Sequence, residues 1–360
     1  MKLYRVKILF LITPWGLIMS ATINGFGFIE YAAKDAAPLH QLFRQMGFTA
    51  VKKHKTKPIT LYRQGQIDFY INECDTGFAA DFTQQHGPCA CGFSIVFDNK
   101  DDALEHSLKG GSEQLEVPNG LNFPAIKGIG DAALYILDKG SYADMLAADF
   151  EDIEGMHQNP TGFGLTFIDH LTHNVYFGHM EKWSKYYEDL FDFSEIRYFD
   201  IKGQKTGLVS KAMTSPNGSV KIPLNESEDP KSQINEYLDE YKGEGIQHIA
   251  LFTDNIYESV ESMRAAGVEF MITPETYFSI IDKRVPEHNE DVARMQRNHI
   301  LIDADQATQK QILLQIFTNT AIGPIFFEII QRKGNEGFGE GNFQALFDSI
   351  ELEQQRRGYL

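Results

Sequence analysis

Three residues in the second half of the chain combine metal-binding chemistry with apolar surroundings. His170 and His248 each belong to a strand-like apolar segment, and Glu328 is the single carboxylate of residues 324–330. That run is too short to cross a membrane and predicts a buried strand. An ionised carboxylate is costly to remove from water, so Glu328 must take up a proton, find a cationic partner or bind a metal ion.

The joint occurrence of these residues favours a metal site over simpler alternatives. Taken alone, a histidine in an apolar strand is more often a hydrogen-bonded core residue, and Glu328 could form a buried ion pair with Arg332 or a lysine. His170 and His248, however, begin equivalent strands of two repeated units, so strand pairing would bring them close together. Two imidazoles and one carboxylate form the facial triad of non-haem Fe(II) oxygenases, which leaves positions open for substrate and dioxygen.

The remaining reactive residues indicate structural roles. His173 is three positions from His170, and this odd offset predicts that it points to the opposite face of the sheet. Cys89 and Cys91 are held apart by an extended strand and are expected to be structural thiols. Three further histidines lie in polar segments and are expected at the surface: His179, His288 and His299.

Residues 337–343 are rich in glycine and precede an expected C-terminal helix. Their pattern is neither G-x-G-x-x-G nor a Walker loop, and Glu340 would repel phosphate. A hinge is the better interpretation, with Asn342 as the helix cap and with Phe338 and Phe343 covering a pocket. The helix is predicted from apolar residues at helical spacing: Phe343, Leu346, Phe347 and Ile350.

The elements that carry these residues recur four times along the chain. Each unit begins with a strand, continues into one amphipathic helix and ends in several strands. This order predicts an α+β fold whose curved sheets enclose a cavity. An acidic, turn-rich linker at residues 150–160 divides the chain into expected domains at 23–157 and 158–360. The four opening strands are expected at residues 26–31, 93–97, 165–170 and 246–252.

The composition is that of a folded, acidic protein. A length of 360 residues suffices for two domains, and 33 Lys and Arg against 50 Asp and Glu leave a net charge of −17. This charge repels phosphate backbones and anionic lipids, so nucleic acid is not expected as a partner. The three cysteines are too few and too clustered for a disulfide framework, which indicates a reducing compartment such as the cytoplasm.

Residues 1–22 depart from this pattern. Lys2, Arg5 and Lys7 precede an apolar stretch that ends in small residues, as in a secretory signal. The stretch is too short for a spanning helix, so no stable membrane span is expected. Alternatively, translation starts at Met19 and the upstream segment is a mis-assigned start. Both alternatives stay open, and a true signal over residues 1–21 would lead to secretion.

Six motifs of the second half closely resemble those of 4-hydroxyphenylpyruvate dioxygenases, in the same order. They lie at residues 223–226, 231–234, 245–251, 314–318, 327–332 and 337–343. A weaker match in the first half includes Gly25-Phe26-Gly27-Phe28 and His86-Gly87-Pro88. The resemblance therefore covers nearly all of the chain after its first 23 residues.

The resemblance implies the vicinal-oxygen-chelate fold, with four βαβββ modules in two open β-barrel-like domains and a C-terminal gating helix. His170, His248 and Glu328 would bind one Fe(II) per chain, and the first domain would be structural. With O2, the implied reaction decarboxylates 4-hydroxyphenylpyruvate, hydroxylates the ring and moves the side chain, which yields homogentisate and CO2 in tyrosine and phenylalanine catabolism. The implied pocket and gate residues are Ser210, Asn225, Gln233, Gln247, Gln315, Phe317, Phe338 and Phe343.

Three other functions stay open. Hydroxymandelate synthase shares the substrate and ligand set but oxidises the side chain, and Phe343 argues against it because a smaller aliphatic residue is expected there. An extradiol catechol dioxygenase of the same fold is disfavoured by the complete set of motifs. A metal-free binding protein would have no need of three buried ligands. The family assembles as homodimers or homotetramers, and either is expected here.

Overall fold

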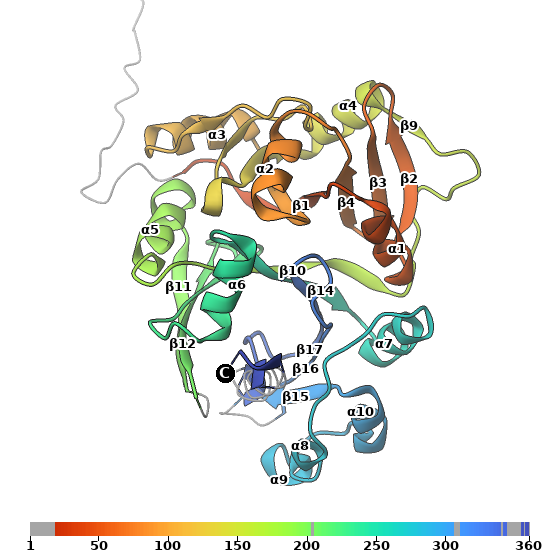
Figure 1. The fold of residues 1–360 in the computed structure, drawn as a ribbon, viewed down its shortest axis with the longest axis vertical. Helices are drawn as coiled ribbons and strands as arrows, with labels where there is room; N and C mark the ends of the chain where they lie inside the picture. The colour runs from red at the N-terminus through yellow and green to blue at the C-terminus, as the bar shows by residue number, and fades with distance from the viewer. Residues whose placement is uncertain are drawn as a thin grey trace, which may run out of the picture.

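The computed structural model describes residues 19–202, 205–305, 310–339, 341–343, 354–355 and 357–359. Residues 1–18 of the signal-like segment lie outside this part of the chain, as does most of the expected C-terminal helix. The described residues form two sheets, one from each half of the chain, and the second sheet curls into an open barrel (Figure 1).

The first sheet has nine strands in the order β6-β7-β8-β5-β1-β4-β3-β2-β9. Strands β1 and β5 pair antiparallel at its centre, and each has the last long strand of its own unit, β4 or β8, as its parallel neighbour. The strands are β1 (Ile23–Ala32), β2 (Thr49–His54), β3 (Ile59–Gln64), β4 (Ile67–Asn72), β5 (Cys89–Phe97), β6 (Gln114–Leu115), β7 (Ala125–Lys127), β8 (Ala133–Asp138) and β9 (Phe150–Asp152). The helices are α1 (Ala37–Gln45), α2 (Phe78–His86), α3 (Lys100–Lys109) and α4 (Lys139–Asp149).

The second sheet repeats this arrangement in the order β11-β12-β13-β10-β14-β17-β16-β15. Strands β10 and β14 pair antiparallel, with β13 and β17 as their parallel neighbours. The strands are β10 (Leu165–Asn174), β11 (Ser194–Lys202), β12 (Gly207–Thr214), β13 (Lys221–Glu226), β14 (Gly245–Thr253), β15 (Leu301–Ala304), β16 (Ile312–Phe317) and β17 (Phe326–Lys333). The helices are α5 (Met180–Phe191), α6 (Gln233–Tyr241), α7 (Ile256–Ala265), α8 (Glu275–Phe278), α9 (Ile281–Arg284) and α10 (Val292–Asn298).

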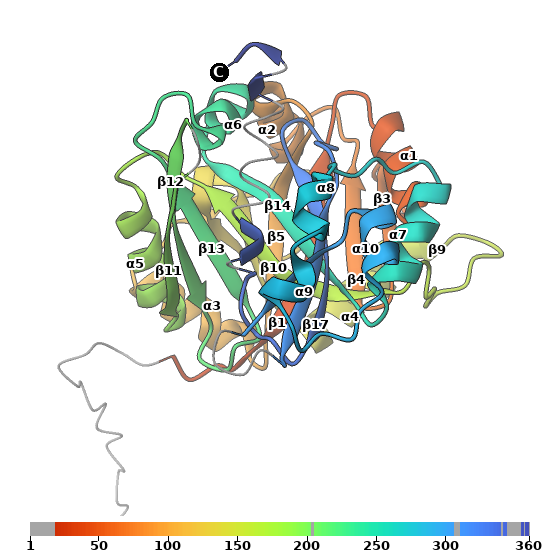
Figure 2. The ribbon, with the colours of Figure 1, turned by 90° about the horizontal axis from the view of Figure 1, so that it is seen from below.

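The expected α+β fold of four repeated units is therefore confirmed. Helix α5 buries Trp183, Tyr187 and Leu190, which recur at helical spacing, and packs against β11 and β12 (Figure 2). Helices α7 and α10 pack on each other at the opposite end of the same sheet. The segment expected as a linker begins with β9, a strand of three residues that pairs with β2 and is too short for a periodic pattern to reveal.

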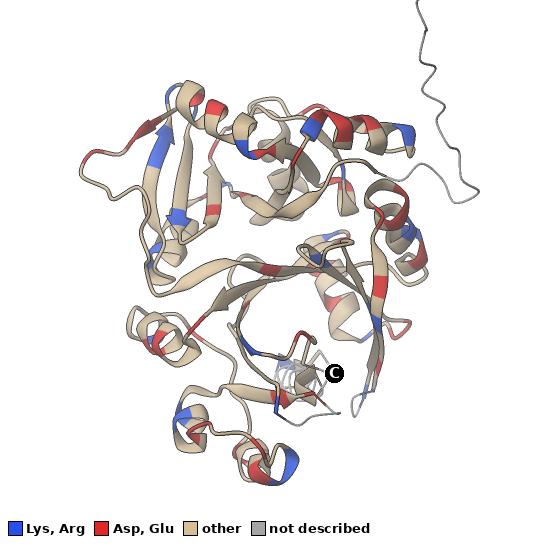
Figure 3. Cartoon of the chain, turned by 180° about the vertical axis from the view of Figure 1, so that it is seen from behind, with Lys and Arg blue, Asp and Glu red and all other residues tan. Residues whose placement is uncertain are grey.

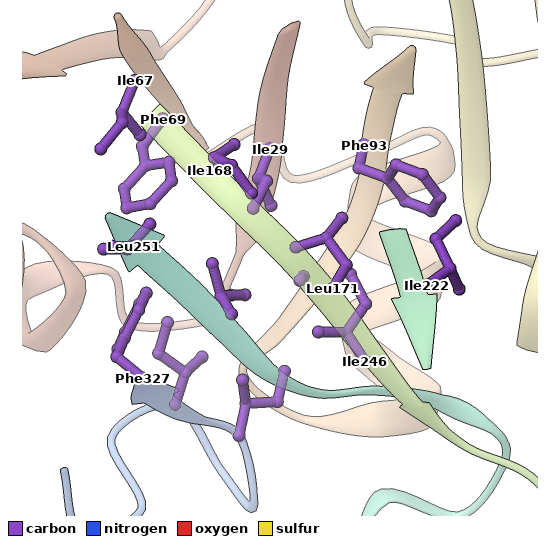
Figure 4. Packing of buried hydrophobic residues seen from close by; sticks show 14 of the residues in the cluster. Ile29, Ile67, Phe69, Phe93, Ile168, Leu171, Ile222, Ile246, Leu251 and Phe327 are labelled. Carbon is purple, nitrogen blue, oxygen red and sulfur yellow. The ribbon is translucent and has the colours of Figure 1, made fainter. Parts of the chain in front are cut away.

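The two halves share a hydrophobic core. Ile29 and Phe69 of the first sheet pack toward Ile168 and Phe327 of the second (Figure 4), and the rings of Phe69 and Phe327 lie 6.1 Å apart. Burial of each such side chain contributes about 1.5–3 kcal/mol. The interface between the halves is thus built like a protein interior, which holds the second sheet in a defined position.

Charge is spread over both halves. Figure 3 shows basic residues interspersed with acidic ones along the helices and strands, so the net charge of −17 is not concentrated in one segment. No helix in the described part of the chain combines the length and apolar character needed to cross a membrane.

Candidate metal centre

Strands β10, β14 and β17 lie side by side and bring the three predicted ligands together. His170 is paired with Ala250, and Ala250 with Glu328, so these residues form one row across the sheet. His248 is two positions from Ala250 and shares its face, because side chains alternate along a strand. The Oε2 atom of Glu328 lies 3.3 Å from Nε2 of His170 and 3.4 Å from Nε2 of His248.

Two irregularities in the pairing of β10 with β14 supply a hydrogen-bond partner for each histidine. Asp169 is an extra residue on β10 and Gln247 an extra residue on β14, so each forms a bulge directly before a candidate ligand. The Nδ1 atom of His170 donates to Asp169 at 2.8 Å, and Nδ1 of His248 donates to Oε1 of Gln247 at 3.0 Å. Both rings therefore direct Nε2 toward Glu328, the orientation that a metal ion bound between them would require.

Burial and mutual charge control the ionisation of this group. His170, His248 and Glu328 are 2%, 4% and 1% exposed. Burial raises the pKa of Glu328, but the facing imidazoles outweigh it and lower that pKa to about 2. Burial lowers the pKa of His170, but the carboxylates of Glu328 and Asp169 raise it above its ordinary value. Burial dominates for His248, whose pKa falls despite Glu328.

The second oxygen of Glu328 is held by Gln315. Its Nε2 atom donates to Oε1 of Glu328 at 2.8 Å and to the carbonyl of Phe338 at 3.0 Å. Its Oε1 atom accepts from Nδ2 of Asn342 at 2.8 Å. Asn342 lies inside the helical residues 341–343, and its side-chain amide donates to Gln315. The expectation that it caps a helix is therefore wrong.

Arg332 does not pair with Glu328, contrary to one of the alternatives drawn from the sequence. Its guanidinium binds both oxygens of Asp169, at 2.7 Å each. Within the described residues, no lysine or arginine forms an ion pair with Glu328, whose nearest titratable partners are the two histidines. A metal ion bound between the two histidines and Glu328 would compensate this buried carboxylate as a cation.

A cavity adjoins the two histidines and brings together five of the eight expected pocket residues. Apolar side chains line this cavity together with several polar ones, which suits a ligand that has an apolar body and carries several oxygen atoms. The five are Ser210, Asn225, Gln233, Gln247 and Phe343.

The other three expected residues surround the ligands. Gln315 binds Glu328, as described above. The ring of Phe338 lies 5.5 Å from that of His170, and the ring of Phe317 lies 6.3 Å from that of His248. These aromatic side chains cover the imidazoles with apolar surface.

Two polar residues of β10 were not expected at the site. Thr172 lines the cavity, and within the described residues its buried Oγ1 atom has no hydrogen-bond partner. Asn174 accepts from Nδ2 of Asn225 at 3.3 Å, and Asn225 also reaches Oε1 of Gln247 at 3.4 Å. Both residues lie at even offsets from His170, and this spacing is the sequence signal that could have identified them.

The other candidate residues lie away from the centre. His173 is buried on the opposite face, as expected, and packs at 5.8 Å on Phe93. Burial raises the pKa of Cys89 to about 12, so the thiol stays protonated. The expectation of a surface position is wrong for His288, whose side chain is 6% exposed and pairs with Asp282.

The donor set and its geometry fit a divalent transition-metal ion. The ligand atoms of His170, His248 and Glu328 all lie within 4.8 Å of one another. Nitrogen and oxygen ligands lie about 2.1 Å from such an ion, so two ligands at a right angle are about 3 Å apart. The separations of 3.3 and 3.4 Å are close to this spacing.

Comparison with known proteins first defines the class. Residues 167–279 match the glyoxalase/bleomycin resistance protein/dioxygenase superfamily. A variant of 4-hydroxymandelate synthase from Streptomyces coelicolor has a similar structure, with a TM-score of 0.77 over 92% of this chain and 98% of that chain. The two are 21% identical, a degree of likeness that shows the fold alone.

Sequence relatives define the family. Residues 19–151 match the N-terminal domain of hydroxyphenylpyruvate dioxygenase. The chain is 48% identical to the 4-hydroxyphenylpyruvate dioxygenase of Pseudomonas aeruginosa, over 94% of this chain and 96% of that protein. It is 50% identical to Hemolysin VllY of Vibrio vulnificus, again over 94% and 96%. The chain belongs to the 4-hydroxyphenylpyruvate dioxygenase family and is a dioxygenase.

Proposed function

We propose that the chain binds one Fe(II) through His170, His248 and Glu328 and converts 4-hydroxyphenylpyruvate and O2 into homogentisate and CO2. The observation that carries this proposal is the buried group of two imidazoles and one carboxylate beside a cavity lined by hydrogen-bonding side chains. Fe(II), when bound, supplies the redox chemistry that activates dioxygen. The named dioxygenases among the relatives support the substrate.

The cavity offers partners for the oxygen atoms of this substrate. Asn225, Gln233 and Gln247 each present an amide that donates and accepts, and Ser210 adds a hydroxyl. These groups would bind the phenol hydroxyl and orient the ring. Phe343 would cover the cavity and exclude water, which strengthens the hydrogen bonds inside.

Product identification tests the reaction. The purified chain, loaded anaerobically with Fe(II), would be mixed with 4-hydroxyphenylpyruvate and O2, and the products separated by chromatography and identified by mass. Homogentisate and CO2 in equal amounts, with one O2 consumed per substrate, are expected. Hydroxymandelate as the main product would overturn the assignment in favour of the synthase.

The metal requirement is tested separately. Glu328→Gln keeps the size of the side chain but removes its charge, so iron content and turnover should both fall. Turnover and iron content equal to those of the unaltered chain would refute the ligand assignment. Substrate binding without turnover by the iron-loaded, unaltered chain would instead favour a binding protein of this fold.

We also propose that residues 23–157 form a structural domain and residues 158–360 the catalytic domain, with a C-terminal gating helix. In support, the group of potential metal ligands found among the described residues lies entirely in the second sheet. A homodimer or homotetramer is proposed, and light scattering after size-exclusion chromatography would distinguish them. A cytoplasmic location is proposed because all three cysteines are free, and cell fractionation would test it.

A further inference from the structure

A buried arginine lies directly behind one of the proposed ligands. The side chain of Arg332 is 6% exposed, and that of its partner Asp169 is 3% exposed. Nε and Nη2 of Arg332 each donate to one oxygen of Asp169 at 2.7 Å. The same carboxylate accepts from Nδ1 of His170 at 2.8 Å. Arg332 thereby fixes the group that orients the His170 ring.

The remaining guanidinium nitrogen reaches the glycine-rich segment. Nη1 of Arg332 donates to the carbonyl of Gly337 at 2.6 Å and to that of Asn335 at 3.1 Å. The next residue, Phe338, contacts the candidate metal centre in two ways. Its ring packs on His170, and its carbonyl accepts from Gln315, which also binds Glu328.

These contacts form a closed circuit. Hydrogen bonds link His170 to Asp169, Asp169 to Arg332, and Arg332 to the backbone of residues 335–338. Phe338 of this segment contacts the ring of His170, and its carbonyl is linked to Glu328 through Gln315. Arginine suits this position because its planar fork can bind a carboxylate with two donors while a third nitrogen binds backbone carbonyls. A lysine carries its three donors on one nitrogen and cannot reproduce the two parallel hydrogen bonds to the carboxylate.

We propose that Arg332 is a positioning residue that couples the orientation of His170 to the placement of residues 335–338, the segment that carries Phe338. A metal ion held by His170 would then order this segment, and the segment would in turn stiffen the ligand. The coupling rests on the proposed metal site. It is a property of Arg332 and Asp169, neither of which is a proposed ligand.

The test combines two measurements on Arg332→Lys and on Asp169→Asn. Calorimetric titration of the metal-free protein with Co(II) gives the affinity, and hydrogen exchange with and without Co(II) gives the protection of residues 335–338. In the unaltered protein, Co(II) should slow exchange in this segment. In either variant, affinity should fall about 10–100-fold, as for other residues that orient metal ligands, and the metal-dependent protection should disappear.

Arg63→Lys is the matched control. Arg63 binds Asp68 through Nε and Nη2 at 2.6 Å each, and this largely buried pair lies in the first sheet, away from the proposed ligands. Its replacement should lower stability but leave Co(II) affinity and the protection of residues 335–338 unchanged. The comparison therefore separates coupling from a general loss of stability.

Two outcomes would overturn the proposal, and they are distinguishable. If the unaltered protein and Glu328→Gln both fail to bind Co(II), the metal site and the coupling fall together. If the unaltered protein binds Co(II), Glu328→Gln does not, and Arg332→Lys and Asp169→Asn keep both affinity and protection, the coupling alone is refuted. Should Arg332→Lys fold poorly, Asp169→Asn decides, because it preserves the shape of the side chain.

Discussion

Replacing Gly339 by alanine tests whether Gln315 holds Glu328 in place. Gly339 has a φ of 78°, a left-handed conformation that costs other residues about 1–2 kcal/mol. A Cβ atom here would lie 2.0 Å from Oε1 of Gln315, so the amide must move. Its hydrogen bond to the Glu328 carboxylate, worth about 1.5–3 kcal/mol, would then break. Together these effects should lower the free energy of unfolding by about 2.5–5 kcal/mol.

Gly155→Ala provides the control for the backbone. Gly155 has a φ of 77°, and a Cβ atom there would meet nothing within 4 Å. Its replacement should therefore lower the free energy of unfolding only by the cost of the left-handed backbone conformation, about 1–2 kcal/mol.

Urea unfolding of both metal-free variants measures the difference, and calorimetric titration with Co(II) measures the effect on the site. Gly339→Ala should bind Co(II) about 10-fold or more weakly, while Gly155→Ala should bind it normally. Equal losses of stability and equal Co(II) affinities in the two variants would refute the role assigned to Gln315.

Three further predictions concern the ligands and the cavity. Glu328→Gln should bind about one tenth or less of the iron retained by the unaltered chain, because a neutral amide is a poor ligand for a hard cation; metal analysis after dialysis checks this. In the metal-free protein, the pKa of Glu328 is about 2, against an ordinary value of 4.5. The ionised Glu328 therefore stabilises the folded state above pH 4.5, and this stabilisation is lost as the pH falls toward 2. This loss should amount to about 3 kcal/mol in acid unfolding and be absent from Glu328→Gln. Thr172→Val should raise KM for 4-hydroxyphenylpyruvate several-fold by removing a buried hydroxyl, and Thr172→Ser should retain the KM of the unaltered chain; equal KM values for the valine and serine variants would exclude a substrate contact.

The candidate ligands could be identified from the sequence because each is a polar residue within an apolar, strand-like segment. A carboxylate in the apolar run around Glu328 is visible without any structure, and so is the recurrence of His170 and His248 at the start of equivalent strands. Strand pairing within repeated units then predicts their proximity. The structure confirms that the three side chains meet.

The hydrogen-bond partners of the candidate ligands could not be predicted in this way. Asp169 and Gln247 serve as acceptors only because each is an extra residue in the pairing of β10 with β14. A bulge depends on the register between strands about 80 positions apart, which neither strand encodes alone. Arg332, four residues after Glu328, looked like its partner, yet it binds Asp169 instead.

By itself, then, the sequence determined which residue types lie in which strands, and through them the α+β repeats and the identity of the candidate ligands. Alternation, helical spacing and the cost of a buried charge are local properties of a chain and can be read along it. The tertiary structure alone decided which side chains complete the centre: Asp169 and Arg332 behind His170, Gln247 behind His248, and Gln315 with Asn342 behind Glu328. Their directional hydrogen bonds join elements far apart in the chain, so they exist only once the sheet has curled and its register is set.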